Sequence, residues 1–457
     1  MRKGRTVTAV NTLARFGNAP AVLLALSVAA HAVPPRYAAT VLDSLEGGRT
    51  LGLALNDGGL VTGNSGSGVN PPGSHAILAQ PDGSIVSIET IEGLLSSSGY
   101  AINNAGQIAG RLAYHSDGQV HNALFRYTAD GGMVDLGDPG SESFTVVGMN
   151  ESGTIIGRAA GAGGELIGFV HIEGGGLLDL NSLAESTLVS PQAIGDAGQA
   201  AGYFQTQQGE IHAFVWDGAF HDLGTLGGTF SDASDVNRDG VVVGGSRLAN
   251  GVSRGFRHVP GQGMDPLPPL AGNVTSCRAL LVTDVGLIAG ICQEGSRHVA
   301  WSFTDADGTR ALGAAFGPGI TTVPVAANDA GEILVRWSDG QTQASSAMIY
   351  KPGSGLYDLN EVIVGGLPWT VAEPVALNAR GQVLARGQVG GTFLTVLLHP
   401  LTPGDLNGDG HVDQADLGAL LAHYGVENGA TYEQGDIDGD GSVGQADLGL
   451  ILSVFGG

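Results

Sequence analysis

Short apolar runs separated by glycine-rich polar turns dominate the chain between residues 36 and 400. Apolar and polar residues alternate in ALFRY (123–127), as they do in a half-buried strand. GVVVG (240–244) has three consecutive apolar residues, as expected of a fully buried strand. No segment before residue 405 has a convincing helical period. The pattern therefore predicts an all-β domain made of many short strands.

One element of this pattern repeats along the domain. Asn-x-x-Gly followed by a short apolar strand recurs with starts 42 to 50 residues apart. We interpret each copy as a tight hairpin turn whose Asn and Gly accept positive φ. The clearest repeat offers four strands, at 212–216, 220–224, 233–237 and 241–245. Four strands in about 46 residues is the size of one β-propeller blade. The eight copies start at Asn56, Asn103, Asn150, Gly195, Asn237, Thr283, Asn328 and Asn378.

The phase of the repeat predicts that the two ends of this domain share one blade. Residues 37–48 match the second strand of a unit, whereas the first-strand element is found only at the end, in GTFLTVLLHP (391–400). An open solenoid would need polar capping repeats, and none is evident. We therefore expect residues 33–400 to form a β-propeller of about eight four-stranded blades, with seven as the alternative.

The best-preserved repeat also resembles a known family. HAFVWDGAFHDLGTLGGTFSDASDVNRDGVVVG (212–244) is similar to the repeat of the HAF extracellular-repeat proteins, and the resemblance extends in degenerate form over most of 36–400. It implies an exported protein and no particular reaction. His75 and His212 both stand at strand starts. They could be metal ligands, but most repeats lack this histidine, so we favour a strand-capping hydrogen bond.

Charge and the N-terminus restrict the cellular setting. The net charge of −24, with only 20 Lys and Arg, argues against a nucleic-acid partner. Residues 1–32 have the order of a secretory signal peptide: a basic start, the apolar run AVLLALSVAA (21–30) and Ala30-His31-Ala32 as the cleavage region. We expect a secreted or cell-surface protein with no membrane span in the mature chain, since no later apolar stretch reaches 18 residues.

The two cysteines, Cys277 and Cys292, are centred on the turn Thr283–Gly286 of the sixth repeat. If that turn is a two-residue hairpin, they lie opposite each other on adjacent strands. Export favours a disulfide between them, with two buried free thiols as the alternative. Their register would be that of a hydrogen-bonded pair, where side chains meet less readily.

Two acidic loops occupy the C-terminus, GDLNGDGHVDQADLGALL (404–421) and GDIDGDGSVGQADLGLIL (435–452). Oxygen-bearing side chains at loop positions 1, 3, 5 and 12, with Gly at 6, match what a calcium loop requires. We predict two calcium ions and folding coupled to their binding. The predicted ligands are Asp405, Asn407, Asp409, the His411 carbonyl, Asp413 through water and Asp416, and in the second loop Asp436, Asp438, Asp440, the Ser442 carbonyl and Asp447.

A helix is expected after each loop, but none in front. With this pattern of loop followed by helix, the tail (residues 401–457) resembles a type I dockerin with duplicated EF-hand-like loops. The resemblance implies docking to a cohesin-like module on a scaffold protein. The implied partner-binding residues are Gln414, Ala415, Leu417, Gln445, Ala446 and Leu448.

Three functions compete at this point. We favour a secreted interaction protein whose propeller displays a binding surface and whose tail docks to a scaffold, with a link to polysaccharide degradation. The first alternative is a carbohydrate-active hydrolase of O-glycosyl bonds, and the second a structural surface-layer component. Gly251-Val252-Ser253-Arg254-Gly255 matches G-x-S-x-G, but no helix is expected after it. We therefore assign no catalytic residue.

Overall fold

A computed structural model describes residues 33–66, 73–141, 143–161, 163–312 and 319–456 of the chain. The predicted signal peptide, residues 1–32, lies outside these ranges. Among the described residues, no helix is long and apolar enough to cross a membrane.

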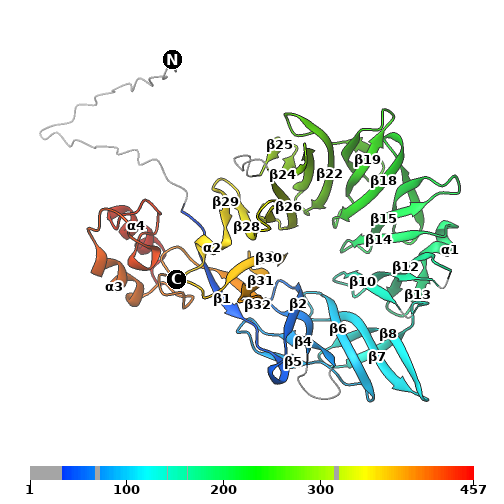
Figure 1. Ribbon diagram of the computed structural model, residues 1–457, viewed down its shortest axis with the longest axis horizontal. Coiled ribbons are helices and arrows are strands. Elements are labelled where there is room, and N and C mark those ends of the chain that lie inside the picture. The colour runs from blue at the N-terminus through cyan, green and yellow to red at the C-terminus, as the bar shows by residue number, and fades with distance from the viewer. Residues whose placement is uncertain (1–32, 67–72, 142, 162, 313–318, 457) are drawn as a thin grey trace, which may run out of the picture. The chain divides into compact units, whose positions relative to one another are not determined.

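The described chain is all-β up to residue 400, and its strands form antiparallel groups of four (Figure 1). Six groups are separate sheets, and two are joined into one eight-stranded sheet by a single parallel bridge between Ile211 and Phe230. This is a β-propeller-like arrangement of eight groups, as many as the predicted repeats. The boundaries of the units differ from the prediction. The strands expected at 212–216 and 220–224 are the last two of one group, and those expected at 233–237 and 241–245 are the first two of the next. The groups are β2 (Thr50–Leu55), β3 (Val61–Gly66), β4 (Ser74–Ala79) and β5 (Ile85–Ser87); β6 (Leu94–Ile102), β7 (Ile108–Ser116), β8 (Gln119–Thr128) and β9 (Gly132–Gly137); β10 (Phe144–Met149), β11 (Ile155–Ala160), β12 (Leu166–Ile172) and β13 (Gly176–Asp179); β14 (Val189–Ile194), β15 (Ala200–Gln205), β16 (Ile211–Trp216) and β17 (Phe220–Gly224); β18 (Gly227–Val236), β19 (Val242–Leu248), β20 (Ser253–Val259) and β21 (Gly263–Pro266); β22 (Val274–Val282), β23 (Ile288–Glu294), β24 (Arg297–Thr304) and β25 (Gly308–Ala311); β26 (Ile320–Ala327), β27 (Ile333–Asp339), β28 (Ser345–Lys351) and β29 (Gly355–Asp358); and β30 (Thr370–Leu377), β31 (Val383–Val389), β32 (Thr392–Pro400) and β1 (Tyr37–Val41).

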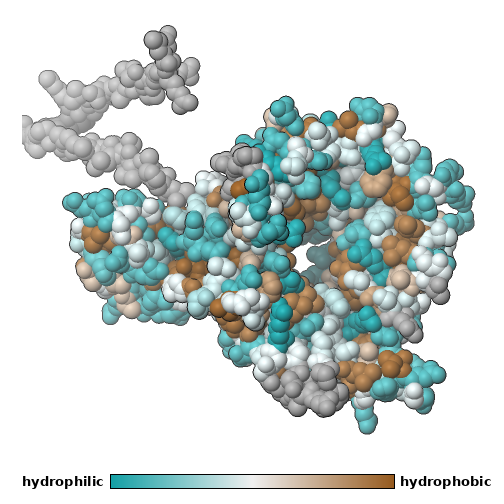
Figure 2. All heavy atoms as spheres, viewed as in Figure 1, coloured by the Kyte–Doolittle hydropathy of each residue, from teal (hydrophilic) through white to brown (hydrophobic). Residues whose placement is uncertain are grey.

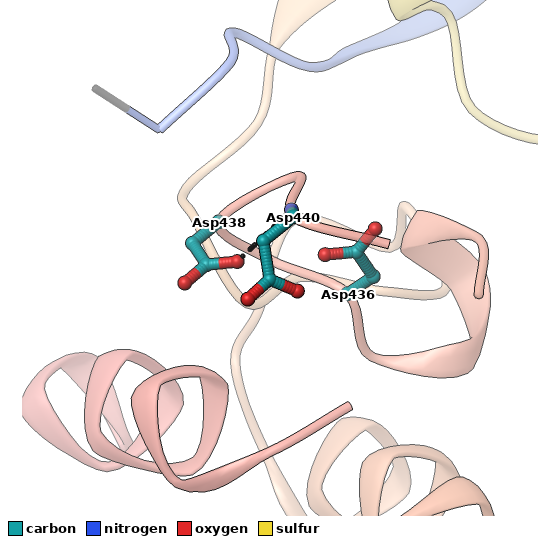
Figure 3. Close-up of side chains that lie close together, drawn as sticks. All are labelled: Asp436, Asp438 and Asp440. Atoms are coloured by element: carbon teal, nitrogen blue, oxygen red, sulfur yellow. Dashed lines mark hydrogen bonds between the residues drawn. The ribbon is translucent and has the colours of Figure 1, made fainter. Parts of the chain in front are cut away.

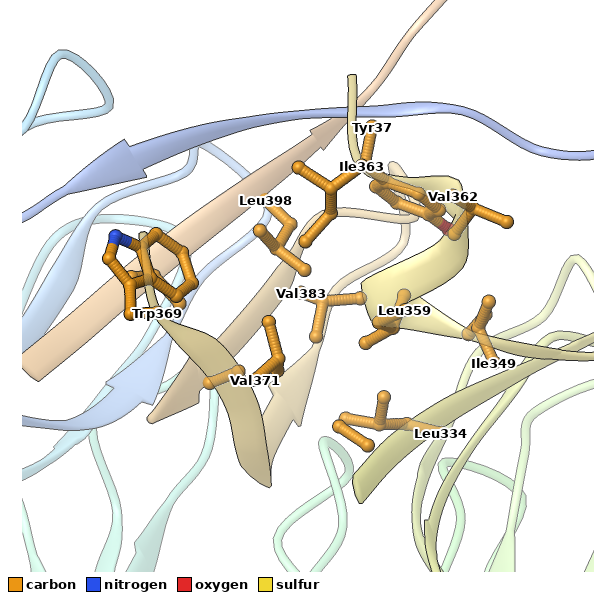
Figure 4. Packing of buried hydrophobic residues seen from close by; sticks show 13 residues of the cluster. Tyr37, Leu334, Ile349, Leu359, Val362, Ile363, Trp369, Val371, Val383 and Leu398 are labelled. Carbon is orange, nitrogen blue, oxygen red and sulfur yellow. The ribbon is translucent and has the colours of Figure 1, made fainter. Parts of the chain in front are cut away.

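The first and last strands belong to the same sheet. β1 pairs antiparallel with β32, and Tyr37 lies opposite Pro400. The predicted pairing of these two segments is therefore present. Tyr37 is fully buried in an apolar cluster with Leu398 of β32, with Ile363 and with residues of β28, β31 and the short helix α2 (Leu359–Val362), as Figure 4 shows. In another group of strands, the short helix α1 (Leu180–Ala184) follows β13, and η1 (Leu45–Gly47) is a single 3-10 turn after β1.

A recurrent glycine explains how adjacent strands of one sheet approach each other. A Cβ added at Gly110 would lie 2.5 Å from the ring of Phe125, and one at Gly290 would lie 2.4 Å from the ring of Trp301. Each of these two glycines thus leaves room for the aromatic ring of its partner residue on the neighbouring strand. The cross-strand pairs are Gly110 with Phe125, Gly157 with Phe169, Gly202 with Phe214, Gly244 with Phe256 and Gly290 with Trp301.

The Asn-x-x-Gly turns differ from the predicted two-residue hairpins. Asn103 N donates to Gln107 O, and Gly106 N donates to Asn103 O, so the loop has three residues. Only its glycine takes positive φ, at +73° for Gly106. A type I turn followed by a left-handed glycine has this form. The expectation that the asparagine itself takes positive φ was wrong, because its side chain serves a different purpose, described below.

Cys277 and Cys292 lie directly opposite each other on β22 and β23 and form a disulfide. Their Cα atoms are 4.0 Å apart, nearer to the about 4.5 Å of a non-hydrogen-bonded pair than to the about 5.5 Å of the hydrogen-bonded pair expected from the sequence. The change has a local cause. The turn is one residue longer than assumed, since Thr283 N bonds to Leu287 O, and an irregularity between Ala279 and Leu281 shifts the register back.

The tail from residue 401 consists of two loops, each followed by one helix. The helices are α3 (Gln414–His423) and α4 (Gln445–Val454), and a 3-10 turn, η2 (Tyr432–Gln434), precedes the second loop. Corresponding residues of the two copies share one small core, which includes Leu406 with Ile437 and Leu420 with Ile451. The internal repeat in the sequence therefore packs against itself.

Candidate metal centre

The first acidic loop is held together by two fully buried carboxylates, Asp405 and Asp416. Asp405 accepts hydrogen bonds from the backbone N–H groups of Gly408 (2.8 Å) and Gly410 (2.9 Å). Asp416, in the first turn of α3, accepts one from the N–H of Asp413 (2.9 Å). No Lys or Arg occurs from residue 405 onward. The acids are thus buried without a basic side chain of the tail to neutralise them.

The second loop repeats this arrangement, but one carboxylate oxygen in it accepts no hydrogen bond from any described residue. Asp447 accepts from the N–H of Gly444 (2.8 Å), as Asp416 does from Asp413. Asp436 accepts from the N–H of Gly441 (3.0 Å) through Oδ2. Its other oxygen, Oδ1, is buried and has no hydrogen-bond partner among the described residues. A buried acceptor without a donor costs about 1–3 kcal/mol, so the site calls for a positive group at this oxygen.

Two further carboxylates converge on the same place (Figure 3). Ligand oxygens of Asp436, Asp438 and Asp440 lie within 4.8 Å of one another. Asp438 accepts from the N–H of Asp440 (3.2 Å), and Asp440 accepts from the N–H of Ser442 (2.8 Å), which fixes both side chains in the loop. Several carboxylate oxygens gathered around one point are the ligand set that a hard divalent cation prefers.

The protonation behaviour of the first-position acids fits the same conclusion. Burial raises the pKa of Asp405 and of Asp436. Hydrogen bonds from the N–H groups of Gly410 and Gly441 act in the opposite direction, and neighbouring carboxylates raise both pKa values again. The charged forms are therefore disfavoured unless a cation compensates them.

The loops differ at their ninth position. Asp413 is the N-cap of α3, and its side chain accepts from the N–H of Ala415 (2.7 Å). Gly444 stands at the same position before α4 and gives no side-chain cap. In the first loop the side chain of His411 is exposed, while Asn407 donates to Asp409 (3.0 Å). The loops therefore share their buried acids and differ in how the following helix begins.

The implied partner-binding residues divide into two groups. Gln414, Ala415, Gln445 and Ala446 are exposed, whereas Leu417 and Leu448 are half-buried and pack against the core of the tail. The sequence reasoning missed a duplicated apolar feature further along each helix. Its exposed members are Leu421 and Tyr424, after the first loop, and Leu452 and Phe455 at the same places 31 residues later.

The asparagines of the repeated turns link one turn to the next around a central opening, visible in Figure 2. Asn103 is 2 % exposed; its Oδ1 accepts from the N–H of Gln107 (3.0 Å), and its Nδ2 donates to the carbonyl of Asn150 (3.3 Å). The donation from one turn to the carbonyl of the next occurs six times among the described residues. The other donors are Asn56, Asn150, Asn237, Asn328 and Asn378.

A cavity of about 350 Å³ lies inside this circle of turns, and five carboxylates line it. They come from repeat-related positions, and each accepts a backbone N–H from a neighbouring turn. Asp284 accepts from Arg238 (2.9 Å), for example, and burial raises the pKa of Glu151. They therefore hold turns together and do not form an isolated acid–base pair. The five are Asp57, Glu151, Asp196, Asp284 and Asp329.

Two weaker sequence candidates also have defined places. Ser253 begins β20, without a following helix, and lines a cavity of about 170 Å³ with Asp232 and His298. No hydrogen bond joins Ser253 to either side chain in the described structure, so the geometry of a nucleophile with its base is absent. His75 and His212 pair with carboxylates of the adjacent chain segments, Glu89 at 2.7 Å and Asp222 at 2.9 Å, as expected for a structural role.

Comparison with known proteins adds little to this picture. No family model matches the chain, and no curated protein does. Among solved structures, a puromycin hydrolase has 14% identity over 64% of this chain and 50% of its own, with a TM-score of 0.37. A post-proline cleaving enzyme from Rickettsia typhi has 8% identity over 74% and 57%, with a TM-score of 0.44. A fucose-specific lectin from Aleuria aurantia has 12% identity over 55% and 90%, with a TM-score of 0.30.

The chain thus spans about half the length of the puromycin hydrolase. Likenesses at these scores identify neither a ligand nor a reaction for this chain.

Proposed function

We propose that this is an exported interaction protein, in which a closed eight-bladed β-propeller carries a binding surface and a dockerin-like tail attaches it to a cohesin-like scaffold. The observation that carries the proposal is the buried, unpartnered Oδ1 of Asp436 beside the carboxylates of Asp438 and Asp440. A tail that buries acids without basic residues needs a cation to fold stably.

Calcium is the cation that best suits these ligands, because all of them are oxygens. In the second loop Asp436, Asp438, Asp440 and Asp447 would hold it by their side chains and Ser442 by its carbonyl. In the first loop Asp405, Asn407, Asp409 and Asp416 would do so, with the His411 carbonyl and with Asp413 through water. Bound calcium would supply the positive charge that the tail lacks.

The scaffold contact is assigned to the exposed side of the two helices. Exposed apolar side chains at equivalent places, Leu421 with Tyr424 and Leu452 with Phe455, give the tail two similar faces. Gln414 and Gln445 are exposed at the start of the same helices. Either face could therefore meet the same partner. No observation favours the hydrolase alternative, because the five carboxylates of the central cavity accept hydrogen bonds from neighbouring turns and Ser253 lacks a base.

Calorimetric titration of the mature chain with calcium tests the proposal. We expect two ions per chain. Asp405→Ala with Asp416→Ala should remove one, and Asp436→Ala with Asp447→Ala the other. As a matched control, Asp265→Ala changes an exposed acid of β21, far from the tail in sequence, and should leave two ions. A stoichiometry near zero for the unmodified chain would refute both the metal centre and the attachment built on it.

A further inference from the structure

The tail contacts the rest of the chain at the place where its first and last strands pair. Leu401, which leads from β32 into the tail, donates its N–H to the carbonyl of Arg36 (2.8 Å). The Arg36 guanidinium lies 4.8 Å from the ring centroid of Tyr432, and Tyr432 belongs to the core of the tail. Arg36 directly precedes β1. Tyr432 of the tail core thus stacks on Arg36, the residue before the first strand.

A second set of contacts reaches the segment after α2. Gly365 donates its N–H to Glu433 (3.2 Å), next to Tyr432 in η2. Val364 donates its N–H to the carbonyl of Tyr37 in β1 (2.9 Å). Val33 and Val364 also pack against the apolar core of the tail. The tail therefore touches β1 from the residues before it and from the segment beside it.

β1 is the shortest strand of this sheet. It has five residues, stands at the sheet edge and pairs along its length only with β32; on its other side Tyr37 makes one isolated parallel bridge, to Ile363. A short edge strand opens locally at a lower free energy than the strands inside a sheet. Contacts that fix residues 33–37 from outside the sheet oppose that opening.

We propose that the tail is a clamp on the β1–β32 pairing. A cation bound in the loops of the tail would then stabilise the pairing of the first and last strands, although it touches neither. The cation-dependent part rests on the function proposed above. The reason is linkage: a cation that binds only the folded tail also favours every contact that requires the folded tail. Arg36, Val33, Tyr432 and Glu433 carry this coupling, and none is among the predicted calcium ligands.

Hydrogen–deuterium exchange of the mature chain, followed by mass spectrometry, measures the clamp through peptides that contain residues 37–41. We expect exchange there to be about tenfold slower with calcium than with a chelator, which corresponds to a coupling of about 1.4 kcal/mol. In Arg36→Gln with Val33→Ser this difference should largely disappear, and chelated wild type and variant should exchange alike. Arg310→Gln, which removes an exposed ion pair with Asp307, is the control and should behave as wild type.

Calorimetry on the same samples separates the two proposals. Two bound ions with calcium-independent exchange at 37–41 would overturn the clamp and leave the metal centre standing. No bound ion would overturn the proposed function. In that case slower exchange in wild type than in Arg36→Gln with Val33→Ser would still support a cation-independent clamp, and equal exchange would overturn it.

Discussion

The asparagines that donate from one repeated turn to the next give a testable prediction. Removing one of their side chains, far from the acidic loops of the tail, should lower the free energy of unfolding of the whole β domain. Asn378 is the best position, because it joins the last repeated turn to the first. Its Nδ2 donates to the Asn56 carbonyl (2.9 Å) and to Gln382 Oε1 (2.7 Å). Its Oδ1 accepts from the N–H groups of Arg380 (3.1 Å) and Gln382 (2.9 Å). The residue is 4 % exposed, so water can replace these partners only in part.

The size of the effect follows from these four hydrogen bonds. Each contributes about 0.5–1.5 kcal/mol net, and the N–H of the buried Gln382 is left without the acceptor that Asn378 gives it. Asn378→Ala should therefore lower the free energy of unfolding by about 3 kcal/mol. The entropy of unfolding for residues 36–400 is about 0.8 kcal/mol/K, so the thermal midpoint should fall by about 4 °C.

Differential scanning calorimetry with calcium present measures this midpoint. Asn250→Ala is the matched control, since Asn250 is exposed and accepts only the N–H of Val252 (3.1 Å) in a local turn. Its midpoint should stay within about 1 °C of wild type, the usual range for surface substitutions. Equal midpoints for Asn378→Ala and Asn250→Ala would refute the view that these asparagines hold the repeats together.

Two further outcomes follow from the same structure. Non-reducing peptide mapping of the exported protein should recover Cys277 and Cys292 in one linked species, and finding both thiols free to alkylation would contradict the disulfide. Burial raises the pKa of Asp235 to about 7, while the N–H groups of Val282 and Val236 act to lower it. Because the pKa of this carboxyl is higher in the folded than in the unfolded chain, the folded protein becomes less stable as the pH rises from about 4 to 7. Asp235→Asn should therefore make the thermal midpoint less dependent on pH across that range, and an unchanged dependence would refute this role of Asp235.

The repeats were predictable because each one combines local signals that agree. The spacing of Asn-x-x-Gly, the four short strands per repeat and the pairing of 37–41 with 392–400 were all predictable from the sequence, and the structure has them. The division of these strands into sheets was predicted with the wrong phase, since each sheet begins two strands later than the predicted unit. The turn type was not predictable from Asn and Gly alone, since both a two-residue and a three-residue loop fit these residue types. One consequence is the register of Cys277 and Cys292, which depends on an irregularity at Ala279–Leu281 that no residue pattern announces.

What the sequence could not supply were the contacts between distant segments. Arg36 and Tyr432 lie almost the whole chain apart, and nothing in either segment indicates the other. The pairing of Gly110 with Phe125 is a different case. Its members are visible at repeat period in several units, and a search for a glycine opposite an aromatic residue would have found them once the strands were aligned.

The same residue type serves two purposes in this protein, and the hydrogen-bond partners distinguish them. Asp284 at the central cavity accepts an N–H from the neighbouring turn, so its charge is used to hold the turns together. Asp436 in the tail accepts an N–H with one oxygen only, and its buried second oxygen has no partner among the described residues. An acid of the first kind needs no ligand, whereas one of the second kind is costly until a cation arrives. For this reason we propose the cation site in the tail and not among the more numerous carboxylates of the cavity.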